Sequence, residues 1–312
     1  MYKKNAKFPQ EFVEAIEDCV VLLETSAKQG SEIEFAFEPF PSLLQQCEQL
    51  ACKDDFLEEP IRTIHHFACT GGTLVSKCIS SMPNTLLMSE VEPHSTINDR
   101  KGVFTPTDLI QLLRNASRNT PKNLLTDVFL NGVRTIHEKC IASGLRLVLR
   151  DHSHSHYCFK NHRNGRNTLL AILSGAFSTR SILWVRHPID SYLSLTKNNW
   201  LHFPNPCIDE YAVRYKKFLN DHSNCKIFKY EDLVTRPEQT MQEICYELDL
   251  PYYQDFLQLF SFFLLSGDSG RTSDKITFRP RLKASDEVSS EIRHSSDLRS
   301  LCDNLQYEIR NH

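Results

Sequence analysis

Residues 65–77 read HHFACTGGTLVSK, and this stretch decides the fold. The first predicted strand, at 61–68, precedes two adjacent glycines, Gly71 and Gly72, and a helical pattern follows them. A strand, a glycine turn and a helix in this order are typical of a phosphate-binding loop, because the helix begins with free N–H groups and a favourable dipole. The Gly-Lys-Ser/Thr ending of a Walker A loop is absent, so the kind of phosphate remains open.

The rest of the pattern alternates between strands and helices. Short apolar strands separated by helices predict a parallel sheet with helices on both faces. Ligands of such sheets bind beyond the carboxyl ends of the strands, so the residues just after each strand are the informative ones. The sequence predicts strands at 85–88, 146–150, 181–185 and 225–230, and helices at 107–117, 124–142 and about 237–248.

The first 58 residues are expected to form a helical extension packed on the main domain. Apolar residues recur at helical spacing between 9 and 29, and a second short helix is expected at 42–52. Residues 59–312 then form the main domain, since no linker or repeat divides them.

Composition excludes several classes of protein. The 312 residues are 40% hydrophobic and 24% charged, as in ordinary globular proteins, and the net charge of −3 argues against a nucleic-acid partner. No signal peptide is expected at the start, and the apolar patch at 257–265 is too short to span a membrane. The eleven cysteines form no CxxC pair, which favours reduced thiols in a cytoplasmic protein over zinc or disulfides.

Residues 186–194, RHPIDSYLS, form the most specific segment. Arg186 ends a predicted strand, Pro188 suits the first turn of the next helix, and Ser194 lies two turns into that helix. An arginine and a serine converging in this way predict a phosphate clamp, because guanidinium binds phosphate bidentately. The alternative is a surface ion pair between Asp190 and Arg186.

A third segment, YEDL at 230–233, follows another strand, and alone it is a weak signal because the two acids could simply cap a helix. Together with CTGGT at 69–73 and RHPIDSYLS, it resembles the sulfotransferases that use 3′-phosphoadenosine-5′-phosphosulfate (PAPS). The resemblance covers roughly residues 61–281. It implies an α/β, P-loop nucleotide-kinase-like three-layer fold with a central parallel sheet.

The resemblance also implies how the nucleotide is held. The glycine loop would bind the 5′-phosphosulfate, with hydroxyl donors from Thr70 and Thr73, and Arg186 with Ser194 would bind the 3′-phosphate. Late basic residues would close over the 3′-phosphate. The implied nucleotide contacts are Cys69, Thr70, Gly71, Gly72, Thr73, Leu74, Arg186, Ser194, Tyr230, Arg271, Arg279 and Arg281.

The chain departs from the family at Cys69, where many members carry a Lys or Arg that stabilises the leaving oxygen. Lys77, one helical turn beyond Thr73, and Arg150, after another strand, are the candidates to replace that cation.

The sequence offers two candidates for the catalytic base. The family often places a histidine after the strand that corresponds to 146–150, which favours His152, with Asp151 as its orienting partner or substitute. Carbohydrate sulfotransferases often show a Glu-Pro after their second strand, and Glu92 matches that position.

Residues 150–156 allow two further interpretations. If they were extended, His152, His154 and His156 would share one face and could bind a metal. The segment could also be a solvated polar loop.

The predicted activity is sulfuryl transfer from PAPS to a hydroxyl or amine, releasing adenosine 3′,5′-bisphosphate (PAP), with no metal cofactor. The Glu92-Pro93 match favours a carbohydrate over other small-molecule acceptors. Two alternatives remain: a P-loop kinase, and a protein that binds PAPS or PAP but has lost catalytic power because of Cys69.

Overall fold

The computed structural model describes residues 59–95, 97, 105–121, 123–159, 166–267 and 275–309. These all belong to one compact unit, Glu58–His312. The helices predicted at 9–29 and 42–52 lie outside the described residues, so the extension at 1–58 and its packing stay predictions. Arg271, a predicted phosphate ligand, also lies outside them.

A five-stranded sheet forms the centre of the described unit, with strand order β2-β3-β1-β4-β5. Every pairing is parallel, which confirms the predicted α/β architecture. All six residues of β1 are buried, as a central strand covered on both faces requires. The strands are β1 (Ile61–His66), β2 (Thr85–Val91), β3 (Arg146–Asp151), β4 (Thr179–Val185) and β5 (Lys226–Lys229).

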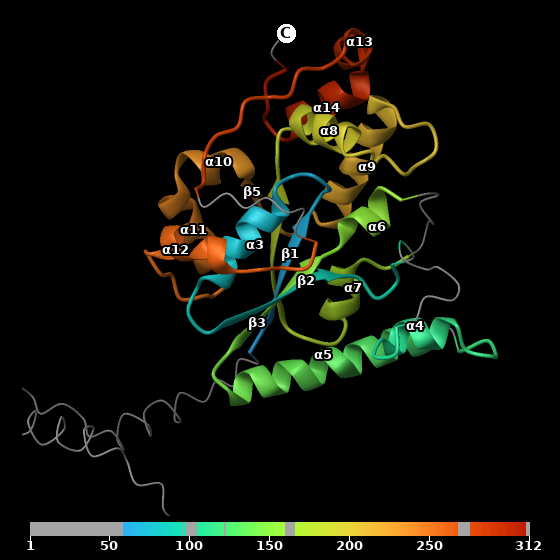
Figure 1. Cartoon of the computed structure of the whole chain (residues 1–312), viewed down its shortest axis with the longest axis vertical. Helices are drawn as coiled ribbons and strands as arrows, with labels where there is room; N and C mark the ends of the chain where they lie inside the picture. Colours follow the sequence, from blue (N-terminus) through green and yellow to red (C-terminus); the bar gives the residue numbers. More distant parts are fainter. Residues whose placement is uncertain are drawn as a thin grey trace, which may run out of the picture. The chain divides into compact units, whose positions relative to one another are not determined.

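Helices cover both faces of the sheet, and α3, α11 and α12 lie on the opposite side from α7 and α9 (Figure 1). Alternate residues of β4 supply the two layers: Ile182 and Trp184 pack with residues of α3 and α11, whereas Leu183 and Val185 pack with residues of α8 and α9. A further cluster joins α5 and α7 to β1 and β3.

The described helices vary widely in length, and α5 is the longest of them. They are α3 (Gly72–Ser80), α4 (Leu109–Arg114), α5 (Leu124–Ala142), α6 (Ser153–Tyr157), α7 (Leu169–Ser174), α8 (Pro188–Lys197), α9 (Ile208–Asp221), α10 (Tyr230–Thr235), α11 (Pro237–Glu247), α12 (Phe256–Leu259), α13 (Asp286–His294) and α14 (Ser296–Asn304), with a 3₁₀ turn at Phe260–Phe262.

Two segments differ from the sequence prediction. Strand β2 continues to Val91 through a register shift after Met88, and Glu90 takes a left-handed backbone with φ of 62°. Residues 153–157 form helix α6 and are not extended. Because residues two apart on a helix point about 200° apart, His154 and His156 do not share a face, so the condition for the alternative metal interpretation, an extended segment, is not met.

The described residues contain neither a membrane-spanning helix nor a disulfide bond. No helix there has both the length and the apolar character needed to cross a bilayer. The eight cysteines of these residues all carry free thiols, and six of them are buried.

Candidate active site

A cavity of about 1090 Å³ opens among the loops that follow β1, β2, β3 and β4. Strands β2 and β3 lie on one side of β1, and β4 and β5 lie on the other, so the cavity stands where the strand order reverses. Residues from all the segments singled out by the sequence line it, among them Cys69, Gly71, Gly72, Thr73, Leu74, Lys77, Glu90, Glu92, Arg150, His152, Arg186, Ser194, Tyr230 and Arg279.

The glycine turn is fixed by two aromatic rings. Gly71 precedes α3 with φ of 85°, and a Cβ there would lie 2.7 Å from the ring of Tyr230. A Cβ on Gly72 would lie 2.6 Å from the ring of His66. No side chain caps the start of α3, so its first N–H groups are available to an anion. The contacts of Gly71 with Tyr230 and of Gly72 with His66 leave no room for a side chain, so both positions require glycine.

The two threonines of the loop have different surroundings. The Thr70 hydroxyl donates to the Phe67 carbonyl at 2.6 Å, and the Thr70 carbonyl accepts from the Trp184 indole at 3.0 Å. Thr70 is fully buried and does not line the cavity, which contradicts its predicted role as a phosphate donor. Thr73, in the first turn of α3, does line the cavity.

This contrast gives a testable prediction. We expect Thr73→Val to weaken PAP binding by about 0.5–1.5 kcal/mol, the net value of one hydrogen bond. Thr70→Val should leave affinity unchanged and lower the melting temperature, because it leaves the Phe67 carbonyl without its short hydrogen bond. Calorimetry measures PAP affinity and thermal unfolding measures stability in both variants. If Thr70→Val weakens PAP binding and Thr73→Val does not, Thr70 is the phosphate donor.

Arg186 lies between the loop and the ring of Tyr230. Its guanidinium carbon is 4.8 Å from the ring centroid, and its Nη1 donates to the Cys69 carbonyl at 3.4 Å. Its Nε is buried with no hydrogen-bond partner among the described residues. An arginine that is held by a ring and retains an unsatisfied donor is suited to bind an anion.

Asp190, in the helix α8 that follows Arg186, is paired with another arginine. Asp190 accepts from Arg281 Nε at 2.7 Å, so the alternative ion pair between Asp190 and Arg186 is wrong. Arg281 is therefore engaged with Asp190 and does not line the cavity, whereas Arg279 does, and the predicted nucleotide contact of Arg281 stays a prediction. Ser194 lines the cavity too, although its hydroxyl donates to the Asp190 carbonyl at 2.8 Å and must rotate to donate to a ligand.

Lys77 and Arg150 are the two candidates for the cation that is missing at Cys69. Of these, Arg150 is already paired with an acidic residue. It forms a close ion pair with Glu90, and its Nε donates to His66 Nε2 at 3.1 Å. Lys77 sits in the last turn of α3, mostly buried, with part of its surface on the cavity.

His152 lies at the cavity, at the start of α6, with its side chain 23% exposed. Its Nε2 is 3.3 Å from Glu90 Oε2, so Glu90 is its carboxylate partner. Asp151, the predicted partner, instead contacts His65 Nδ1 at 3.0 Å and does not line the cavity. Sequence analysis missed Glu90 because the register shift in β2 is not visible in the residues themselves.

Glu92 is almost fully buried between cations and polar groups. Its Oε1 lies 2.6 Å from Arg166 Nη2 and accepts from the His94 backbone N–H at 2.9 Å. Burial alone would raise the pKa of Glu92, but His156 and Arg166 outweigh burial and lower that pKa. A carboxylate with a lowered pKa is a weak base, so Glu92 is better suited to organise the site than to take a proton.

We therefore expect Glu92→Gln to act mainly on stability. Loss of the charge that faces Arg166 should lower the free energy of unfolding by about 1.5–3 kcal/mol, as for hydrogen bonds to charged groups. Since the pKa of Glu92 is lowered by folding, its stabilisation is present above its unfolded pKa and is lost as pH falls through the folded value. Urea unfolding near neutral and at acid pH measures this, and an unchanged stability at neutral pH would contradict it.

An aromatic wall forms the side of the cavity beyond His152. Its members are His154, Phe159, Trp200 and His202. The ring of His154 lies 6.1 Å from that of Trp200 and 5.6 Å from that of His202. Burial lowers the pKa of His154 to about 3, so its ring is neutral at physiological pH. No sequence pattern marked this wall, because its residues come from α6, the residues just after it, and the loop between α8 and α9.

Comparisons with known proteins agree with this architecture. No family model and no curated protein sequence matches the chain. Among solved structures, the chain is similar to the sulfotransferase domain of the curacin biosynthetic pathway, with 17% identity over 80% of this chain and 99% of that domain and a TM-score of 0.51. It is also similar to the sulfotransferase domain of the Synechococcus PCC 7002 olefin synthase, with 17% identity over 80% of this chain and 96% of that domain and a TM-score of 0.52. At these identities the likeness concerns the backbone, and the chain therefore has the fold of the sulfotransferases.

Proposed function

We propose that this protein is a PAPS-dependent sulfotransferase. The observation that carries the proposal is that the glycine turn at Gly71 and Gly72 and the guanidinium of Arg186 line one cavity. Two phosphate-binding groups that line the same cavity fit a ligand that carries two anionic groups. A 3′-phosphorylated adenosine with a 5′-phosphosulfate is such a ligand.

The 3′-phosphate end is assigned to Arg186, with help from Ser194 and Arg279. Arg186 is held by the Tyr230 ring and retains an unsatisfied Nε, so little ordering is needed when an anion binds. This end distinguishes PAPS from ATP, which has no 3′-phosphate.

The sulfuryl end is assigned to the start of α3. An acceptor oxygen attacks sulfur in line, its bond to sulfur forms as the bond from sulfur to the bridging phosphate oxygen breaks, and PAP leaves with that electron pair. The uncapped N–H groups of α3, the Thr73 hydroxyl and Lys77 lie where they can stabilise the developing charge.

His152 is assigned as the base that takes the acceptor proton. Glu90 stabilises the imidazolium that results, since its Oε2 lies 3.3 Å from His152 Nε2. Arg150 in turn holds Glu90, so the three side chains form one chain of alternating charge.

We further propose a carbohydrate acceptor in a cytoplasmic protein. The aromatic wall around Trp200 supplies rings on which a sugar face can pack. Glu92 lines the same cavity, where its carboxylate can accept hydrogen bonds from sugar hydroxyls. The free thiols fit a reducing compartment.

One comparison of ligands tests the assignment. PAP should raise the melting temperature more than ATP–Mg²⁺ at equal concentration, and labelled sulfate from PAPS should appear on members of a glycan array. A larger shift with ATP–Mg²⁺ would favour a P-loop kinase. Binding of PAP without transfer to any hydroxyl or amine acceptor would favour a protein that has lost catalytic power through Cys69.

The missing cation can be located with paired variants. Lys77→Met should lower turnover about 10–100-fold, the effect of losing roughly 1.4–2.7 kcal/mol of charge stabilisation in the transition state. Arg150→Met should act through Glu90 and His152 and therefore change the pH profile of turnover. If Lys77→Met leaves turnover unchanged, the start of α3 alone stabilises the leaving group.

A further inference from the structure

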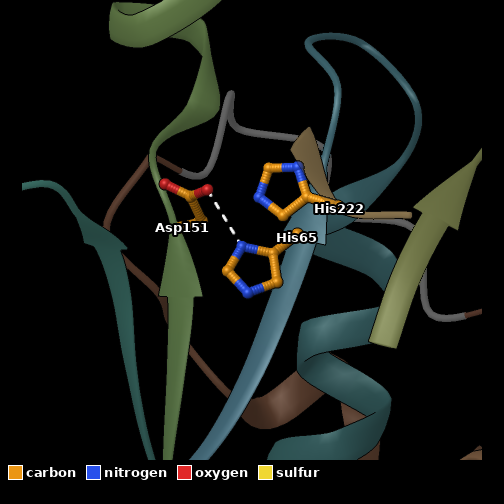
Figure 2. A group of neighbouring side chains, drawn as sticks. All are labelled: His65, Asp151 and His222. Carbon is orange, nitrogen blue, oxygen red and sulfur yellow. Dashed lines mark hydrogen bonds and ion pairs between the residues drawn. The ribbon is translucent and has the colours of Figure 1, made fainter. Parts of the chain in front are cut away.

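Three side chains that the proposed function does not use gather behind the cavity. They are His65 near the end of β1, Asp151 at the end of β3 and His222, which follows α9 (Figure 2). All three are at least 98% buried, and none lines the cavity. One ligand atom from each residue can be chosen so that all three atoms lie within 4.8 Å of one another.

Two polar atoms of this cluster have no hydrogen-bond partner among the described residues: Asp151 Oδ1 and His222 Nε2. A buried polar atom left without a hydrogen bond destabilises the folded protein, so two such atoms in one cluster require an explanation. An occupant that satisfies both atoms would remove this cost.

The protonation of His222 shows what kind of occupant fits. Its Nδ1 lies 2.8 Å from the Phe218 carbonyl, and since a carbonyl only accepts, Nδ1 carries the proton. The neutral ring then presents a lone pair at Nε2. A neutral imidazole with an available lone pair is the form that binds metal ions.

We propose that His65, Asp151 and His222 bind one divalent transition metal ion, with zinc the best match to two imidazoles and a carboxylate. His65 Nδ1 and Asp151 Oδ2 lie 3.0 Å apart, close to the roughly 3.3 Å that separates two ligands of a tetrahedral zinc ion. The other ligand atoms lie within 4.8 Å of one another, so a shift of at most about 1.5 Å would bring them to the separation of two zinc ligands. The fourth position is left to water or to the second oxygen of Asp151.

Surrounding hydrogen bonds orient two of the ligands. The non-ligating Nε2 of His65 lies 2.8 Å from Thr63 Oγ1, which in turn lies 2.7 Å from Ser181 Oγ. The non-ligating Nδ1 of His222 donates to the Phe218 carbonyl. Metal-binding histidines characteristically engage their second nitrogen in this way, which fixes the ring and its tautomer.

The ion would be structural. It would tie the end of β1 to the end of β3 and to the residue after α9, directly beside His66 and His152, whose rings border the cavity. No spacing motif marks this cluster in the sequence, because its three residues are far apart in the chain.

The test measures metal in the full-length protein. Protein produced in zinc-supplemented medium and dialysed against a weak chelator should retain about one zinc per chain by mass spectrometry of the elements. His222→Phe keeps a ring in place but removes the ligand, so its zinc content should fall at least about tenfold.

His137→Phe is the matched control. His137 is also buried, with Nε2 bonded to the Glu59 carbonyl at 2.8 Å. Among the described residues its Nδ1 has no hydrogen-bond partner and it belongs to no cluster of metal ligands. It should retain zinc like the wild type. Wild-type protein without zinc, or equal zinc in the two variants, overturns the proposal and assigns the cluster to a bound water. If His222→Phe does not fold, Asp151→Asn replaces it.

Discussion

Replacing His152 with asparagine is expected to lower turnover roughly 10²–10⁴-fold, the usual effect of removing a general base. PAP affinity should stay within about twofold of the wild type, because calorimetry on the product reports only contacts to the nucleotide. The geometric reason is that His152 borders the cavity and pairs with Glu90, at 3.3 Å, and not with the glycine turn.

Two controls separate this role from a structural one. Glu90→Gln should lower turnover less than His152→Asn and shift the pH at which turnover is half maximal, because it removes the charge that stabilises the imidazolium. Glu92→Gln should lower stability with a smaller effect on turnover, since its carboxylate is already paired with Arg166. If Glu92→Gln proves the more damaging to turnover in folded protein, Glu92 is the base.

Replacing Arg186 with alanine is expected to weaken PAP binding by about 1.5–3 kcal/mol, or roughly 10–150-fold in Kd. Arg186 is positioned before any ligand binds by the Tyr230 ring and the Cys69 carbonyl, so its loss removes a charged donor without compensation.

Arg281→Ala is the matched control for charge. Its guanidinium pairs with Asp190 and does not line the cavity, so PAP affinity should change much less. Equal losses in the two variants would mean that long-range charge, and not a clamp, attracts the nucleotide. Calorimetric titrations at two salt concentrations distinguish these cases, because a distant charge is screened more than a direct contact.

The sheet was predictable because its strands are short apolar runs separated by helices. Strand β4 illustrates this, since Ile182, Leu183, Trp184 and Val185 are all apolar, whereas β1 was recognised from the glycines that follow it. Helix α5 was predicted with the bounds it has, Leu124–Ala142, because its period is long and regular.

Details of the site were less accessible, because they depend on tertiary contacts. The roles of Thr70 and Thr73 differ only because the Thr70 hydroxyl turns back to Phe67. Glu90 meets His152 through an irregular stretch of β2, and Asp151 turns to His65, a residue distant in sequence. Helix α6 was not predicted for another reason, since its five polar and aromatic residues carry no helical period.

The central claim is that Arg186 and the glycine turn bind opposite ends of one nucleotide. The most direct test is a thermodynamic cycle that compares PAP with adenosine 5′-monophosphate in wild-type protein and in Arg186→Ala. We predict that the wild type prefers PAP by at least about tenfold, that the variant loses most of this preference, and that both proteins bind the monophosphate equally. A preference for PAP that survives in the variant would contradict the account, because the 3′-phosphate would then be bound elsewhere.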